Sequence, residues 1–280
     1  MVASPFDYCL DQVRQGDRDR YLALLFAPQA ARGHLAALAA FNLELARTRD
    51  QVSESLLGLI RLQWWREAIG EIRAGGHVRQ HQVVEALAEA SRARGLDADR
   101  MLAMIEARES ELEGAEAPSL AAFNERADAT AGALLHLSLQ ALGLDAPDLA
   151  EPTRQIGRAY AAAGIARSVL RDAGQRRLRL PQEALSAAGI DADRLFDLKP
   201  QPQLAEAVRQ VAEEAARNLA AARRHAVPRS ASPLVLTARI AGLHLERLRR
   251  AAYDPFAPAL ADQHPMDVWR LLWSNLSGRF

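Results

Sequence analysis

Four arginines each lie a few residues before an aspartate in this sequence: Arg47, Arg49, Arg167 and Arg171. The aspartates are Asp50 and Asp172. A guanidinium group can bind phosphate through paired hydrogen bonds without a metal ion. The pattern therefore predicts a substrate-binding or phosphate-binding role for the four arginines. It is also compatible with ion pairs to neighbouring carboxylates or with exposure to solvent, so both interpretations stay open.

The elements that position these side chains are expected to be helices. The chain has 280 residues and is 49% hydrophobic but only 5% aromatic, so Leu and Ala, which are strong helix formers, supply much of the apolar surface. Helical periodicity runs from about residue 19 onwards, and Gly, Pro and Asp punctuate it. We predict an all-α helical bundle forming one domain over 1–280, with 1–16 as a loosely ordered N-terminal extension.

Charge and hydropathy limit the expected partners and location. Lys+Arg and Asp+Glu both number 35, so no overall field attracts nucleic acid, and we expect no nucleic-acid partner. Cys9 is the single cysteine, which fits a reducing compartment. The sequence contains no apolar stretch long enough to span a bilayer. We expect a cytoplasmic protein.

The segment 265–280 is the candidate for peripheral contact with the inner membrane. Its apolar residues recur at helical spacing: Met266, Trp269, Leu272, Trp273 and Leu276. Tryptophan suits the interface between lipid and water. The alternative is a last helix that docks on the bundle, because the polar face of this segment has few basic residues.

Several segments carry a resemblance to one known family, in that family's order: 20–28, 35–47, 49–54, 60–68, 130–132, 164–172 with 180–181, and 247–254. The second segment reads Ala-Leu-Ala-Ala-Phe up to Phe41, and the fourth carries the pair Trp65-Arg66. In these motifs the chain resembles the squalene/phytoene synthases. The resemblance implies the isoprenoid synthase fold around a central cavity, and an activity that joins two prenyl diphosphates.

The same resemblance implies two helices that each present aspartates one turn apart, which bind Mg²⁺ and neutralise a leaving diphosphate. Here the first motif would place its carboxylates at Ala46 and Asp50, so one is missing. The second motif keeps Asp172, but Gln175 follows where another carboxylate is expected. We therefore predict no intact catalytic or metal-binding set, with Asp50 and Asp172 as vestigial candidates. No cofactor is expected, except Mg²⁺ if synthase activity survives.

The pattern is most similar to a degenerate branch of the family that contains the mitochondrial complex I assembly factor and bacterial relatives. This implies a pseudoenzyme that acts in respiratory complex I assembly, has complex I subunits or assembly proteins as partners, and holds an isoprenoid or phospholipid. The alternative is an active prenyltransferase of carotenoid, squalene or hopanoid biosynthesis, with metal ligands rearranged around Asp50, Asp172 and Glu44. A lipid carrier is a third hypothesis.

The adjacent residues Trp64 and Trp65 are candidate substrate-binding residues under this resemblance, because indole faces pack well against a polyisoprene chain. Ordinary core packing is the competing interpretation. Adjacent residues of a helix point in different directions, so we expect one ring in the core and the other at a helix junction.

Overall fold

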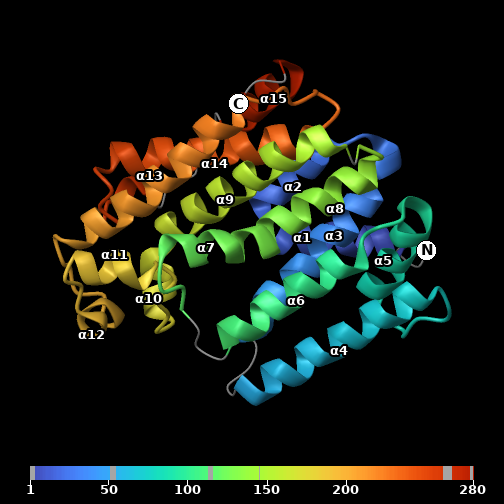
Figure 1. Ribbon diagram of the computed structural model, residues 1–280, viewed down its shortest axis with the longest axis horizontal. Coiled ribbons are helices and arrows are strands. Elements are labelled where there is room, and N and C mark those ends of the chain that lie inside the picture. The colour runs from blue at the N-terminus through green and yellow to red at the C-terminus, as the bar shows by residue number, and fades with distance from the viewer. Residues whose placement is uncertain (1–3, 51–54, 113–115, 145, 261–266, 278–279) are drawn as a thin grey trace. The chain divides into compact units, whose positions relative to one another are not determined.

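The computed structural model describes residues 4–50, 55–112, 116–144, 146–260, 267–277 and 280. Every regular element in these ranges is a helix, which confirms the all-α fold class (Figure 1). The described residues form two compact units. The first unit takes its residues from 4–112, 132–150 and 228–234, and the second from 116–131, 151–227 and 235–280. The expected single domain with a central cavity stays a prediction.

The first unit is built around α3, which α1, α5 and α8 contact. Its helices are α1 (Pro5–Gly16), α2 (Arg18–Leu25), α3 (Gln29–Arg47), η1 (Thr48–Asp50), α4 (Ser55–Ala74), α5 (Gln82–Arg94), α6 (Ala98–Leu112), α8 (Ala133–Leu142) and η3 (Pro147–Leu149). The middle of α3 is buried from Leu35 to Leu43 and is rich in alanine. Small side chains allow neighbouring helices to approach closely, so α3 packs on more than one side.

The expectation of a loosely ordered extension over 1–16 is wrong for residues 5–16, which form α1. Ser4 starts this helix with a capping box: its hydroxyl accepts from the Asp7 backbone N–H at 3.2 Å, and the Asp7 carboxylate accepts from the Ser4 N–H. Cys9 and Val13 then lie fully buried against the core of the first unit. The cap Ser4-Pro5 was the local signal in the sequence for this helix.

The second unit contains α7 (Leu120–Ala127), α9 (Ala150–Arg167), α10 (Val169–Gly174), α11 (Gln182–Ala187), α12 (Ala192–Phe196), α13 (Leu204–Ala222), α14 (Ser232–Arg250), η4 (Pro258–Leu260) and α15 (Asp267–Ser277). In α13 one face is buried at helical spacing, from Leu204 through Val208 and Val211 to Ala215. Here α11 packs against α13, and α10 against α12. Among the described helices of the protein, none is both long and apolar enough to cross a membrane.

Candidate functional site

The segment that resembles the first aspartate motif covers the last turn of α3 and η1. Ala46 is exposed on α3 and carries only a methyl group where the resemblance expects a carboxylate. Thr48 donates a hydrogen bond from its hydroxyl to the Glu44 carbonyl at 3.1 Å, which holds the turn between the two helices. Asp50 closes η1, and its side chain lies outside the described part of the structure.

Both arginines of this segment make contacts inside the first unit. The guanidinium group of Arg47 packs against Gly16 at the end of α1. A Cβ at position 16 would overlap this guanidinium group. Arg49 donates to the backbone carbonyl of Glu111 at 3.0 Å, near the end of α6. The last carbonyls of a helix lack helical partners, so this bond stabilises the α6 terminus. The structure therefore gives Arg47 and Arg49 packing and capping contacts.

Glu44, the extra carboxylate of the active-enzyme hypothesis, is paired with an arginine. Its Oε2 accepts from Arg61 Nη2 at 2.6 Å, and the Glu44 side chain is only 13% exposed. Burial, together with the smaller effect of the negative charge of Glu44, raises the pKa of the nearby Cys9 thiol to about 12. The thiol is thus neutral and unreactive at physiological pH.

The two tryptophans of α4 belong to an aromatic cluster of the first unit. Trp65 is 1% exposed and meets Phe41 edge to face, with 5.2 Å between ring centroids, which confirms one ring in the core. Trp64 is half-buried, and the Arg79 guanidinium lies 4.7 Å from its ring centroid. His81 contacts both indoles at 5.4 Å. Burial and the positive charge of Arg61 lower the His81 pKa below its usual 6.5, although Glu44 opposes the shift.

In the second unit, Asp172 lies on α10 and is 4% exposed. Its Oδ2 accepts from the Ser168 hydroxyl at 2.8 Å. Two arginine side chains lie near the same carboxylate: Arg171 at 3.5 Å and Arg179 at 4.0 Å. A buried carboxylate needs such partners to stay charged. Asp172 is therefore the centre of a local network of a hydroxyl and two guanidinium groups.

The chain after Asp172 turns sharply, and this turn directs its basic side chains. Arg176 has a positive φ of 54°, which is unfavourable for a residue with a side chain. Its guanidinium stacks over Phe196 at 4.8 Å and lies 4.0 Å from Asp193. Arg167 is exposed at the end of α9. The structure thus brings Arg171 to Asp172, whereas Arg176 faces α12.

The surroundings of Asp172 do not fit a magnesium ion. Mg²⁺ takes oxygen ligands in an octahedral arrangement. At Asp172 the carboxylate is shared by a hydroxyl donor and two arginines, whose positive charge repels a cation. One turn later stands the amide Gln175 instead of a carboxylate. Within the described residues, no cluster of three or more His, Cys, Asp or Glu side chains is placed to hold a metal ion.

The sequence alone did not predict which residues pair with the aspartates of this region. Ser168 and Arg179 bind Asp172 from four and seven residues away, and only the helical spacing of Ser168 signalled its contact. A second missed pair joins Arg158 on α9 to Asp128, with bonds of 2.8 and 2.6 Å. Asp128 opens a π-helical turn, η2 (Asp128–Gly132), which contains the family-like residues 130–132. Such turns often mark functional regions.

Comparison with known proteins agrees with this architecture. A sequence model of the squalene/phytoene synthase family matches residues 13–277. The mouse (Mus musculus) protein named NADH dehydrogenase (ubiquinone) complex I, assembly factor 6, is 27% identical over 95% of this chain and 81% of its own length. The crystal structure of a dehydrosqualene synthase superposes with a TM-score of 0.81 at 19% identity, covering 98% of this chain and 96% of the other. A squalene synthase from Alicyclobacillus acidocaldarius gives 0.78 at 19% identity, covering 90% and 95%.

The helices and their order therefore define an all-α isoprenoid synthase fold. The chain belongs to the squalene/phytoene synthase family. Within that family it lacks a carboxylate at Ala46 and near Gln175, and it surrounds Asp172 with arginines.

Proposed function

We propose that this protein is a non-catalytic member of the squalene/phytoene synthase family that acts in the assembly of respiratory complex I. The observation that carries the proposal is its similarity, over 95% of its length, to a mouse protein named as an assembly factor of that complex. The proposed partners are complex I subunits or other assembly proteins. The proposed place of action is the cytoplasmic side of the inner membrane.

The site chemistry supports the absence of prenyl transfer. A prenyl diphosphate ionises only when the charge of the leaving diphosphate is neutralised, and metal ions can supply that neutralisation. Ala46 offers no ligand, and Asp172 already accepts from Ser168 and lies beside Arg171 and Arg179. Recruiting Mg²⁺ to Asp172 would require breaking these contacts. The network is better suited to hold its own carboxylate than to hold a metal.

A phosphorylated ligand is compatible with the same residues. The Arg171 and Arg179 side chains are 64% and 41% exposed, and each lies at the long end of ion-pair distance from Asp172. Guanidinium groups placed in this way can bind a phosphate directly. We include an isoprenoid or phospholipid as the proposed ligand, with its phosphate at these two arginines.

Deleting the gene tests the assembly role. We expect NADH:ubiquinone oxidoreductase activity in membranes to fall, while succinate oxidation, which bypasses complex I, stays unchanged. The wild-type chain should restore the activity. The double variant Asp50→Asn and Asp172→Asn should restore it equally, since asparagine at 172 keeps an acceptor for Ser168. Unchanged complex I activity after deletion would contradict the proposal.

A direct assay tests the absence of catalysis. The purified protein is incubated with Mg²⁺ and farnesyl or geranylgeranyl diphosphate, and pyrophosphate release is followed beside the same double variant. We expect no turnover above the variant. Turnover that disappears in the variant would instead establish an active prenyltransferase of carotenoid, squalene or hopanoid synthesis.

A further inference from the structure

Helix α15 presents its largest apolar side chains to the solvent. Trp269, Trp273 and Leu276 are 64%, 72% and 59% exposed, whereas Leu271 is buried. Positions 269, 273 and 276 recur at helical spacing, so the three side chains form one stripe along the helix. A helix that only packed against the second unit would be expected to bury its tryptophans, because each buried indole removes a large apolar area from water. The stripe is therefore a candidate contact surface.

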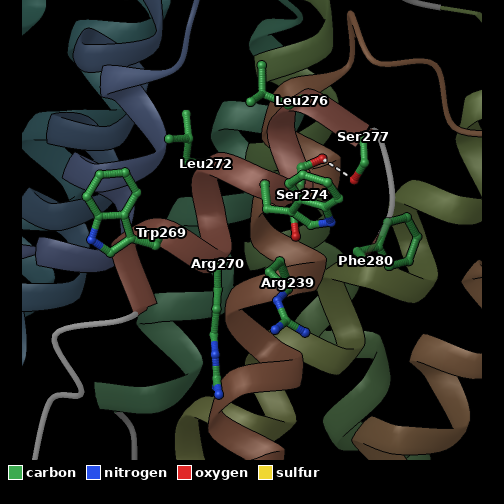
Figure 2. A pocket seen from close by; sticks show the side chains of 9 residues that line it. Arg239, Trp269, Arg270, Leu272, Ser274, Leu276, Ser277 and Phe280 are labelled. Carbon is green, nitrogen blue, oxygen red and sulfur yellow. Dashed lines mark hydrogen bonds between the residues drawn. The ribbon is translucent and has the colours of Figure 1, made fainter.

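A groove of about 590 Å³ lies along this helix and combines apolar and basic side chains (Figure 2). Its lining includes Trp269, Trp273, Leu276, Phe280, Arg239 and Arg270. Figure 2 shows Leu272 and Leu276 pointing away from the side on which Arg239 and Arg270 extend. The surface thus has an apolar side next to a cationic one.

The described side chains of the cationic side include a cluster of arginines around one glutamate. Three guanidinium groups lie near the carboxylate of Glu246: Arg239 at 3.7 Å, Arg250 at 3.6 Å and Arg270 at 3.2 Å. Arg249 and Arg250 are exposed in the last turn of α14. Among the described ion pairs at this site, three guanidinium groups share one carboxylate, so positive charge outweighs negative charge in this cluster beside the tryptophans.

From this arrangement we infer that α15 and the end of α14 bind the surface of a bilayer that contains anionic lipid. Indole rings partition to the boundary between headgroups and acyl chains. Arginines next to them are attracted by the negative charge of anionic headgroups. The apolar stripe of α15 therefore matches the acyl chains at the bilayer surface, and the cationic side matches the anionic headgroups.

Charge favours the bilayer over a second copy of this chain as the occupant. In a two-fold dimer the same patch meets itself, so the arginines of both copies would be brought together. Such like-charge contacts oppose association. Phosphate headgroups instead compensate the excess charge around Glu246. The inference concerns lipid binding and does not depend on the proposed role in complex I assembly.

Vesicle flotation tests the inference with the full-length protein. We expect the wild type to bind phosphatidylcholine vesicles that contain phosphatidylglycerol, and to bind pure phosphatidylcholine vesicles at least about tenfold more weakly. The variant Trp269→Ser and Trp273→Ser should lose about tenfold or more of its binding to the anionic vesicles. The matched control is Leu56→Ser and Ile60→Ser, which removes two comparably exposed apolar side chains (63% and 58%) from the first unit.

A charge variant tests whether the arginines at the end of α14 contribute more to binding than arginines elsewhere on the protein. Arg249→Gln with Arg250→Gln should weaken binding to the anionic vesicles about tenfold. Arg14→Gln with Arg73→Gln, which removes the same charge from exposed positions of the first unit, should leave binding within about twofold. All substituted side chains are exposed, so we expect each variant to fold. Far-ultraviolet circular dichroism checks this.

Three results would overturn the inference. One is equal, weak flotation with both vesicle types. Another is binding that the α4 control loses and the tryptophan variant keeps. The third is a dimer in solution that the tryptophan variant converts to a monomer, with no vesicle binding by the wild type, which would assign the stripe to a second copy.

Discussion

The two tryptophan pairs of this protein show how differently the same residue type is used. On α4, Trp65 lies in the core, and Trp64 is covered by Arg79 and His81. On α15, Trp269 and Trp273 are both mostly exposed. The α4 pair contacts other aromatic rings of the first unit, whereas the α15 pair lines a groove.

The comparison teaches that neighbours decide the role of a tryptophan more than spacing does. Trp64 has both Arg79 and His81 against its ring, so its surface is already occupied. Trp273, by contrast, is 72% exposed. We therefore expect the α4 pair to contribute to folding and the α15 pair to contribute to binding.

The largest expected effect is at Trp65. Substitution by alanine leaves a large void next to Phe41, and such truncations lower the free energy of unfolding by about 3–5 kcal/mol. Chemical denaturation monitored by circular dichroism measures this loss. The conservative variant Trp65→Phe should lose clearly less. A loss below about 1 kcal/mol in Trp65→Ala would mean that the aromatic cluster is not part of the stabilising core.

A smaller effect is expected at Arg79, which covers Trp64. Its guanidinium binds Glu71 at 2.7 Å and donates to the Trp64 carbonyl at 3.0 Å. The Arg79→Ala variant should lower the free energy of unfolding by about 1 kcal/mol, because it removes a stacked cation together with a partly exposed ion pair.

Acrylamide quenching of tryptophan fluorescence reads the second consequence of Arg79→Ala. The exposed fraction of the emission should rise as Trp64 is uncovered. The matched control is Arg66→Ala, which removes another α4-side ion pair, to Glu109, without touching an indole. Equal quenching in the two variants would show that Arg79 does not shield Trp64.

Much of this fold could be predicted from the sequence, because helical periodicity and alanine-rich segments are local signals. The family motifs also gave the missing carboxylate at Ala46. The contacts of the charged residues could not be predicted in the same way. Arg49 reaches the carbonyl of Glu111, more than sixty positions away, and no local pattern encodes that contact.

The tryptophans show the same limit. Helical geometry predicts that Trp64 and Trp65 point in different directions, and it gives the stripe of α15. It does not reveal that Arg79 and His81 cover Trp64, since both follow a turn after α4. Nor does spacing alone distinguish a stripe that docks on the protein from one that stays exposed. For α15 the structure favours exposure, with Leu271 rather than the tryptophans buried.

The pH dependence of the α4 cluster gives a further test. The pKa of His81, in this cluster, is lowered by burial and Arg61, and that of His34, which lies outside it on α3 against Phe6, by burial and Arg94. Because the unfolded chain takes up these protons first, stability is complete above the ordinary histidine pKa of 6.5 and falls as pH drops below it. Glu44 and Glu85 face His81 and oppose the shift, so the loss should be modest.

Denaturation at several pH values between neutral and mildly acidic measures this slope. His81→Phe keeps an aromatic edge against the two indoles and cannot be protonated, so its free energy of unfolding should change less with pH than that of the wild type. His77→Phe is the control, because His77 is exposed. A slope that is unchanged in His81→Phe but flattened in His77→Phe would place the titration outside the aromatic cluster.

The smallest expected effect is on the other side of the comparison. Trp269→Ser with Trp273→Ser should change the free energy of unfolding by no more than about 0.5 kcal/mol, because exposed side chains away from structural contacts contribute little. The same variant should lose most of the red-shifted, easily quenched emission, since the remaining Trp64 and Trp65 are shielded. If this double variant were instead destabilised as strongly as Trp65→Ala, the α15 tryptophans would have to be buried in the folded protein. In that case the α15 tryptophans could not contact a membrane surface, and the proposed difference between the two tryptophan pairs would be wrong.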